Sequence, residues 1–129
     1  MIKELIELQR GSKATCVVIE DSEFKNVGQT LYMDAFIEDK YLYAGDIGNP
    51  IFKEKLDAIA SNGELTYFMI RKIDDVDFAS QERYLGLVKD REFEGYTLPD
   101  NVIIIFTVKD REGLKKISKE LYKFCVVAF

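Results

Sequence analysis

The sequence predicts one α/β domain in which a three-layer parallel β-sheet has helices on both of its faces. Short runs of β-branched and other apolar residues recur along the chain, and segments with helical spacing of apolar residues separate most of them. Strands that alternate with helices favour right-handed crossovers and therefore parallel strands. The chain has 129 residues, of which 47% are hydrophobic, and this is enough for a single core.

The first elements are a short helix and a buried strand. Residues 2–10 alternate apolar and charged side chains as an amphipathic helix does, and Gly11 would end it. Residues 14–20 form a β-branched run without alternation, which is typical of a strand buried on both faces. The polar residues 21–28 are expected to form a loop.

The middle of the chain predicts two helices and two strands. Residues 30–40 have apolar side chains on one side of a helix, and residues 41–44 resemble a brief strand that ends in turn residues. Pro50 suits the first position of the next helix, residues 51–60. Residues 65–70 then form a second buried strand.

The last third of the chain repeats this pattern. Residues 77–90 have helical spacing, although an internal glycine weakens the second half of that helix. A loop or short hairpin is expected over residues 92–100. Residues 102–106 give the strongest indication of a central strand, and a helix over residues 111–123 leads into a final strand over residues 125–129.

Charge and composition exclude several classes of function. The 18 basic and 23 acidic residues give a net charge of −5, and no basic run exceeds two residues, which argues against nucleic-acid binding. The absence of histidine removes the commonest general base and metal ligand. Cys16 and Cys125 lie in apolar runs and are expected to be small buried hydrophobes. No apolar stretch approaches the roughly 20 residues of a membrane span, so a cytoplasmic location without membrane contact is expected.

Charged and hydroxyl side chains follow the predicted strands at their carboxyl ends, where open parallel sheets bind ligands. Glu20 and Asp21 lie at the end of the first strand, Arg71 and Lys72 follow a middle one, and Thr107 and Lys109 follow the central one. Residues 23–30 keep the last glycine and the threonine of a phosphate-binding loop. They have glutamate at the first glycine and glutamine at the lysine, so alone they predict only the start of a helix.

Three segments together resemble the core of AAA+ ATPases, in the style of the MoxR-like and dynein-like branch. The matching segments are residues 56–65, 67–77 and 98–107, and the family's turn into the sensor strand resembles Gly95-Tyr96-Thr97-Leu98-Pro99-Asp100-Asn101-Val102. The resemblance implies a P-loop NTPase-like sheet. It covers about half of the chain well and, through the loop at residues 28–30, the rest loosely.

The residues at the family's functional positions differ from the family's own. The resemblance places the phosphate-binding lysine on Gln29 and the magnesium-holding and water-activating carboxylates on Arg71 and Lys72. The sensor asparagine falls on Lys109 and the arginine finger on Lys123. Two cations in place of two carboxylates would repel a divalent ion, so ATP hydrolysis by the family's route is not expected.

Other features leave alternatives open. Gly28 and Thr30 retain the family's residue types. The first alternative function is therefore a nucleotide-binding domain that still binds ATP through Gly28, Gln29 and Thr30, with weak or no hydrolysis. A register shifted by three residues would make Asp74 and Asp75 the acidic pair, but the strand would then have to continue through Arg71 and Lys72.

The cations at the strand ends have two interpretations. Arg71, Lys72 and Lys109 could converge as a metal-free anion site beside a helix N-terminus. Alternatively, nearby acidic residues neutralise them in a salt-bridged relic of the family's site. The second interpretation is favoured, because an unpaired buried cluster of like charges is costly. The acidic candidates are Glu20, Asp21, Glu23, Asp74 and Asp75.

The predicted function is a catalytically inactive AAA+-like domain that acts as a protein-interaction or regulatory module. Its partner would be another protein, with an active AAA+ ATPase as one candidate, or a second copy of the chain. The aromatic loop of residues 93–96 is a candidate contact feature, but the favoured interpretation is that its aromatic side chains pin the loop to the core.

A receiver-like switch domain is a second alternative. Residues 16–23 resemble the first strand and acidic pair of response-regulator receivers, and Lys109 after Thr107 resembles their switch pair. Asp46, however, comes too soon after Asp21 to be the phosphoacceptor.

Overall fold

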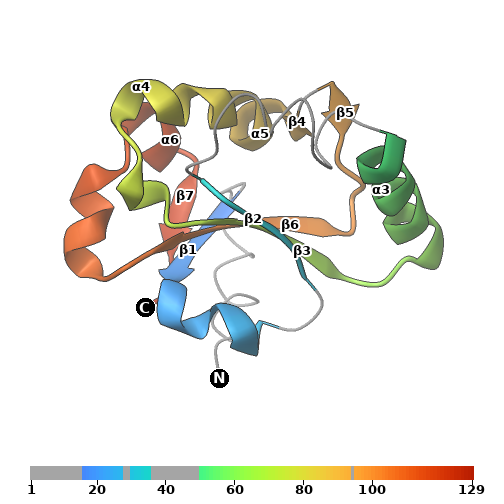
Figure 1. Cartoon of the computed structure of the whole chain (residues 1–129), viewed down its shortest axis with the longest axis horizontal. Coiled ribbons are helices and arrows are strands. Elements are labelled where there is room, and N and C mark those ends of the chain that lie inside the picture. The colour runs from blue at the N-terminus through green and yellow to red at the C-terminus, as the bar shows by residue number, and fades with distance from the viewer. Residues whose placement is uncertain (1–15, 28–29, 36–49, 94) are drawn as a thin grey trace.

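A computed structural model describes residues 16–27, 30–35, 50–93 and 95–129 and contains a five-stranded parallel sheet. The spatial order of the strands is β2-β3-β6-β1-β7 (Figure 1). Their bounds are Cys16–Glu20 (β1), Thr30–Asp34 (β2), Thr66–Arg71 (β3), Val102–Val108 (β6) and Cys125–Val127 (β7). All seven residues of the central strand β6 are buried, which explains its continuous apolar run.

The described α-helices lie on one face of this sheet (Figure 1). They are α3 (Pro50–Asn62), α4 (Phe78–Gln81), α5 (Leu85–Asp90) and α6 (Lys119–Tyr122). The 3-10 helix η1 (Asp21–Asn26) lies across the sheet from them. The shorter pieces are η2 (Ile73–Asp75), η3 (Glu82–Tyr84), η4 (Arg111–Lys116) and the antiparallel ribbon of β4 (Glu92–Phe93) and β5 (Tyr96–Thr97). Within the described ranges, no helix has the length and apolar character to cross a membrane.

The predicted parallel α/β class is confirmed, and the predicted strands 14–20, 65–70, 102–106 and 125–129 correspond to β1, β3, β6 and β7. The predicted helix at 51–60 is α3, which begins at Pro50 as expected. Both faces were expected to carry helices. Among the described residues the second face is covered by η1 and the buried Val27 instead.

Two predicted helices differ from the structure. Residues 30–34 form β2 and pair with β3 in parallel, so the helix expected over residues 30–40 is wrong at its start. The helix expected over residues 111–123 is instead η4 followed by the single turn α6. The predicted helix 2–10 and strand 41–44 lie outside the described residues.

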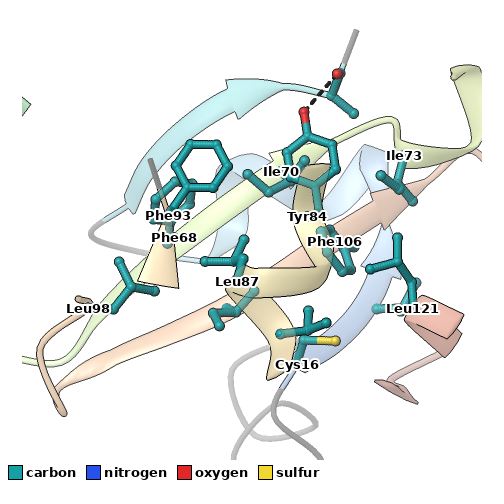
Figure 2. Packing of buried hydrophobic residues seen from close by; sticks show 14 of the residues in the cluster. Cys16, Phe68, Ile70, Ile73, Tyr84, Leu87, Phe93, Leu98, Phe106 and Leu121 are labelled. Atoms are coloured by element: carbon teal, nitrogen blue, oxygen red, sulfur yellow. Dashed lines mark hydrogen bonds between the residues drawn. The ribbon is translucent and has the colours of Figure 1, made fainter. Parts of the chain in front are cut away.

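An aromatic cluster forms the centre of the larger core, between the sheet and the helices (Figure 2). Tyr84 stacks on Phe93, and the edge of Phe106 faces Tyr84. The Tyr84 hydroxyl donates a hydrogen bond of 2.8 Å to the Ala35 carbonyl, shown by the dashed line in Figure 2. A buried hydroxyl needs such a partner, and this bond ties the end of β2 to the helical layer.

Phe93 also packs the aromatic loop of residues 93–96 against the core. Its ring is buried and packs edge-on against Phe68, and Tyr96 packs at the margin of the same cluster. The expectation that the aromatic side chains of this loop pin it to the core is therefore confirmed for Phe93 and Tyr96.

Gln81 is fully buried and connects three loops through its side-chain amide. Its Nε2 donates to the carbonyls of Ile73, Val76 and Lys116 at 3.3, 3.1 and 2.6 Å. Its Oε1 accepts from the Ser118 N–H at 2.7 Å. Because both ends of the amide are satisfied, the burial of this polar group is compatible with stability.

Candidate functional site

The order of the strands places the expected ligand site at the carboxyl end of β1. The strands β6, β3 and β2 lie on one side of β1 and the last strand, β7, lies on the other. In open α/β sheets ligands bind beyond the carboxyl ends of the strands, where the direction of winding changes. Here Asp21 follows β1, Arg71 ends β3, and Thr107 lies near the end of β6.

These three residues form one hydrogen-bonded network. The Arg71 guanidinium binds the Asp21 carboxylate through two bonds, Nε to Oδ1 at 3.0 Å and Nη2 to Oδ2 at 2.9 Å. The Thr107 hydroxyl donates to Asp21 Oδ1 at 2.7 Å and accepts from the Lys72 N–H at 2.9 Å. One carboxylate therefore joins the ends of the three adjacent strands β1, β6 and β3.

The electrostatics of the network favour an ionised Asp21. The pKa of Asp21 is lowered mainly by its hydrogen bond to Arg71, while partial burial opposes this shift and the Thr107 hydroxyl adds to it. The side chains of Arg71 and Asp21 are only 16% and 20% exposed. The pair is thus shielded enough to be stronger than an ordinary surface ion pair.

The predicted pairing of Arg71 with Asp21 is confirmed, whereas Lys72 and Lys109 are exposed. Both lysines line a cavity of about 360 Å³ together with Ser22 and three carboxylates, those of Asp21, Asp74 and Asp75. An anion in this cavity would face more carboxylates than lysines. The geometry therefore argues against the metal-free anion site.

Asp74 lies on η2 beneath that cavity. Its Oδ2 accepts from the Lys109 N–H at 3.2 Å, and its Oδ1 is buried with no hydrogen-bond partner among the described residues. The strand β3 ends at Arg71, and Lys72 has a left-handed backbone with φ of 60°. The shifted register, in which the strand continues to an Asp74 and Asp75 pair, is therefore wrong.

The expected phosphate-binding loop is not followed by a helix. Thr30 is the first residue of β2, while Gly28 and Gln29 lie outside the described residues. Only residues 21–29 connect β1 to β2, and the first six of them form η1. The helix N-terminus that a phosphate-binding loop uses does not follow Thr30.

Lys123 does not join the other cations. It follows α6 and precedes β7, whose first residue pairs with the first residue of β1, so it lies at the amino ends of the strands. Its Nζ pairs with Glu120 at 3.4 Å on the surface. The structure therefore brings Arg71, Lys72 and Lys109 to one edge and places Lys123 at the opposite edge.

The turn that carries the family resemblance has a structural role here. Asn101 Nδ2 donates to the Ile59 and Glu64 carbonyls at 2.8 and 2.6 Å, and Arg91 Nη2 donates to the Pro99 and Val102 carbonyls at 2.7 Å each. These bonds fasten the end of α3 and the ribbon to the start of β6.

Comparison with solved structures identifies the fold. A mutant of RuvB from Thermotoga maritima, an AAA+ ATPase, superposes with a TM-score of 0.52 at 11% sequence identity. The match covers 98% of this chain and 43% of that protein, so the chain spans less than half of RuvB. The fold is therefore P-loop NTPase-like. No family model and no curated protein matches the sequence.

The P-loop NTPase-like sheet excludes the receiver-like alternative. Receiver domains have the strand order 2-1-3-4-5, in which the first strand pairs with the second and third. Here β1 pairs with β6 and β7, the fourth and fifth strands of the sheet in chain order. The receiver-like prediction is therefore wrong.

A magnesium–nucleotide complex, which the fold implies, does not fit these residues. Two cations, Arg71 and Lys72, end β3 and follow it, and both oxygens of Asp21 already accept bonds from Arg71. In the part of the chain that the structure describes, no three His, Cys, Asp or Glu side chains are arranged to hold a metal ion.

A second surface was missed by reasoning from the sequence. Tyr122 is 42% exposed and Phe78 is 56% exposed. Tyr122 borders a groove of about 470 Å³, and Phe78 borders a neighbouring cavity that shares Lys115 with it. Asp74, Asp75 and Asp77 also line the cavity beside Phe78. We therefore restrict the name lysine–aromatic surface to the lining of the groove beside Tyr122, which comprises Leu114, Lys115, Ile117, Lys119, Tyr122 and Lys123.

Proposed function

We propose that the chain is a non-hydrolytic AAA+-like domain that acts by binding protein. The observation that carries this proposal is the network of Arg71, Asp21 and Thr107. It joins three strand ends where the resembling family places the carboxylates that hold magnesium and orient water. A carboxylate that accepts three charged or hydroxyl donors has little remaining capacity to bind a metal ion.

Nucleotide assays test the loss of turnover. Wild-type protein with ATP and magnesium should release phosphate no faster than the Gln29→Ala and Arg71→Ala variants. Thermal unfolding should also be unchanged by ATP, because a ligand at 100 times its dissociation constant would add about 2.7 kcal/mol. Magnesium-dependent hydrolysis well above both variants would contradict the proposal, and ATP stabilisation without hydrolysis would support a nucleotide-binding domain instead.

The lysine–aromatic surface supports the second half of the proposal. Residues 111–123 carry five basic and two acidic side chains, which leaves 13 basic and 21 acidic residues elsewhere in the chain. Lys115 and Lys123 pair with Glu112 and Glu120, but these pairs are highly exposed and are easily exchanged for a partner's carboxylates. The exposed Tyr122 ring lies beside Lys115, Lys119 and Lys123, and this arrangement suits an acidic protein surface that offers an apolar side chain.

A second copy of this acidic chain is the partner we propose for this surface. Light scattering after gel filtration should show concentration-dependent association at low salt, weakened by Lys119→Glu and by Tyr122→Ser. The control is Lys25→Glu, which makes the same charge change on η1 across the sheet and should associate like the wild type (Figure 1). Monomers at all concentrations, or equal association of all variants, would refute self-association.

A further inference from the structure

The two cysteines face each other across neighbouring strands at one end of the sheet. Cys16 and Cys125 are the first residues of β1 and β7 and are direct partners in the parallel register. Their Sγ atoms are 2.7 Å apart. Cys16 is a buried member of the larger core, and Cys125 is partly buried and packs against that core. Figure 2 shows Cys16 at the edge of the residues drawn.

The strand geometry permits a covalent bond between them. Neighbouring parallel strands place partnered Cα atoms about 4.8 Å apart. This lies within the roughly 4.4 to 6.8 Å over which disulfides form without backbone movement. Both cysteines are free thiols in the structure, and their sulfurs would need to approach by only roughly 0.7 Å to reach a disulfide bond length.

The two thiols are not equivalent. Cys16 is 1% exposed, while Cys125 is partly exposed on the last strand of the described sheet. The neighbouring Cys125 sulfur, followed by burial, raises the pKa of the Cys16 thiol far above its usual value. Cys125 is thus the thiol that an external reagent reaches first, and Cys16 is positioned to resolve the product.

We propose that Cys16 and Cys125 are a modification site at which a small-molecule disulfide oxidises the pair to an intramolecular disulfide that links β1 to β7. The Cys125 thiolate attacks one sulfur of the reagent, and one reagent thiolate leaves. Cys16 then loses its proton to solvent and attacks Cys125 Sγ, which breaks the mixed disulfide and releases the second reagent thiolate. Two protein thiols are oxidised, and one disulfide is reduced to two thiols that take up two protons.

The covalent link would constrain most of the chain. The two cysteines are 109 positions apart, and closing a loop of that length removes much of the entropy of the unfolded chain. For a domain of this size, the effect corresponds to an increase of about 10 °C in the midpoint of thermal unfolding. The reduced and oxidised forms would therefore differ in stability while sharing one fold.

Oxidised glutathione is the probe for the test, with the full-length chain. After incubation and removal of the reagent, the monomer should be lighter by two hydrogen atoms and contain no titratable thiol under denaturing conditions. Its midpoint should rise by about 10 °C, and dithiothreitol should restore both thiols and the original midpoint. Cys16→Ala and Cys125→Ala should show no such rise, and Cys125→Ala should react far more slowly than Cys16→Ala.

Three results would overturn the inference. In the first, both thiols remain titratable after prolonged exposure to oxidised glutathione. In the second, a glutathione adduct stays on Cys125 and is not displaced by Cys16. In the third, a disulfide-linked dimer forms in place of the lighter monomer. All three are read from the wild-type protein, so the outcome does not depend on the stability of either variant. None depends on ATP turnover or on the lysine–aromatic surface, so this inference and the proposed function fail independently.

Discussion

The Arg71–Asp21 pair allows a quantitative test of what holds the three strand ends together. The substitution Asp21→Asn keeps the size of the side chain and an oxygen that can accept from Thr107, but it removes the charge that faces the guanidinium. Removing one partner of a fully buried pair costs about 3–5 kcal/mol, and removing one from an exposed pair costs about 0–1 kcal/mol. With both side chains about one-fifth exposed, we expect a loss of about 2 kcal/mol in unfolding free energy.

The expected loss depends on pH in a definite direction. The pKa of Asp21 is lowered in the folded state, so the ionised carboxylate stabilises the fold above its unfolded pKa of about 3.9. This contribution is lost as the pH falls through the lower, folded value. The difference between wild type and Asp21→Asn should therefore be full at pH 7 and shrink below about pH 4.

Urea denaturation from pH 7 to pH 3, followed by circular dichroism, measures this difference. A loss of about 2 kcal/mol at pH 7 corresponds to a roughly 30-fold change in the folding equilibrium. The double variant Asp21→Asn with Arg71→Gln should recover part of the loss, because it removes the guanidinium left without its carboxylate. A cost under about 0.5 kcal/mol, or a cost that does not change with pH, would refute the reasoning.

Four further substitutions test the packing by the same urea measurement. Gly113→Ala should lower the unfolding free energy by about 1–3 kcal/mol, because a Cβ there would lie 2.5 Å from an oxygen of Asp74. Its control is Gly86→Ala in helix α5, where the nearest atom to an added Cβ is 3.5 Å away. This substitution should raise the unfolding free energy by about 0.5–1 kcal/mol. Gln81→Leu should cost about 2–4 kcal/mol, because it leaves buried backbone groups without partners; a neutral result would contradict the role given to that amide. Tyr84→Phe should cost about 1–2 kcal/mol through the lost 2.8 Å bond, and an unchanged midpoint would show that the bond contributes little.

The buried strands were predictable from sequence because their residues are apolar on both faces. Local sequence alone indicates a strand at Thr66–Arg71 and at Val102–Val108. Burial on both faces of a strand selects a run of mostly apolar residues, and this run is visible without knowledge of the neighbouring strands. Thr30–Asp34 was mistaken for a helix because Leu31, Ala35 and Phe36 have helical spacing. Its pairing with β3, more than 30 residues away in the chain, is a long-range contact that local spacing does not encode.

The site was predictable as a set of charges but not as a bonded network. Arg71 and Asp21 lie together as expected, because the carboxyl ends of β3 and β1 meet at one edge of the sheet on either side of β6. Thr107 follows the predicted strand over residues 102–106 and was placed at the expected ligand edge, but nothing in a single sequence shows that its hydroxyl donates to Asp21. Gln81 was missed for the same reason, because a polar residue within a helical pattern is ordinarily exposed.

The Arg71–Asp21 pair also restricts which sequences the chain can reach by single substitutions. Arg71→Asp would introduce a carboxylate of the kind that P-loop NTPases of the AAA+ type carry there. It would also place two like charges next to each other at a shielded edge of the sheet, where mutual repulsion destabilises the fold. Changing Asp21 first would leave a guanidinium without that carboxylate. Each single step lowers the folding stability, so a change from this charge arrangement to a metal-binding one that avoids this loss needs both substitutions together.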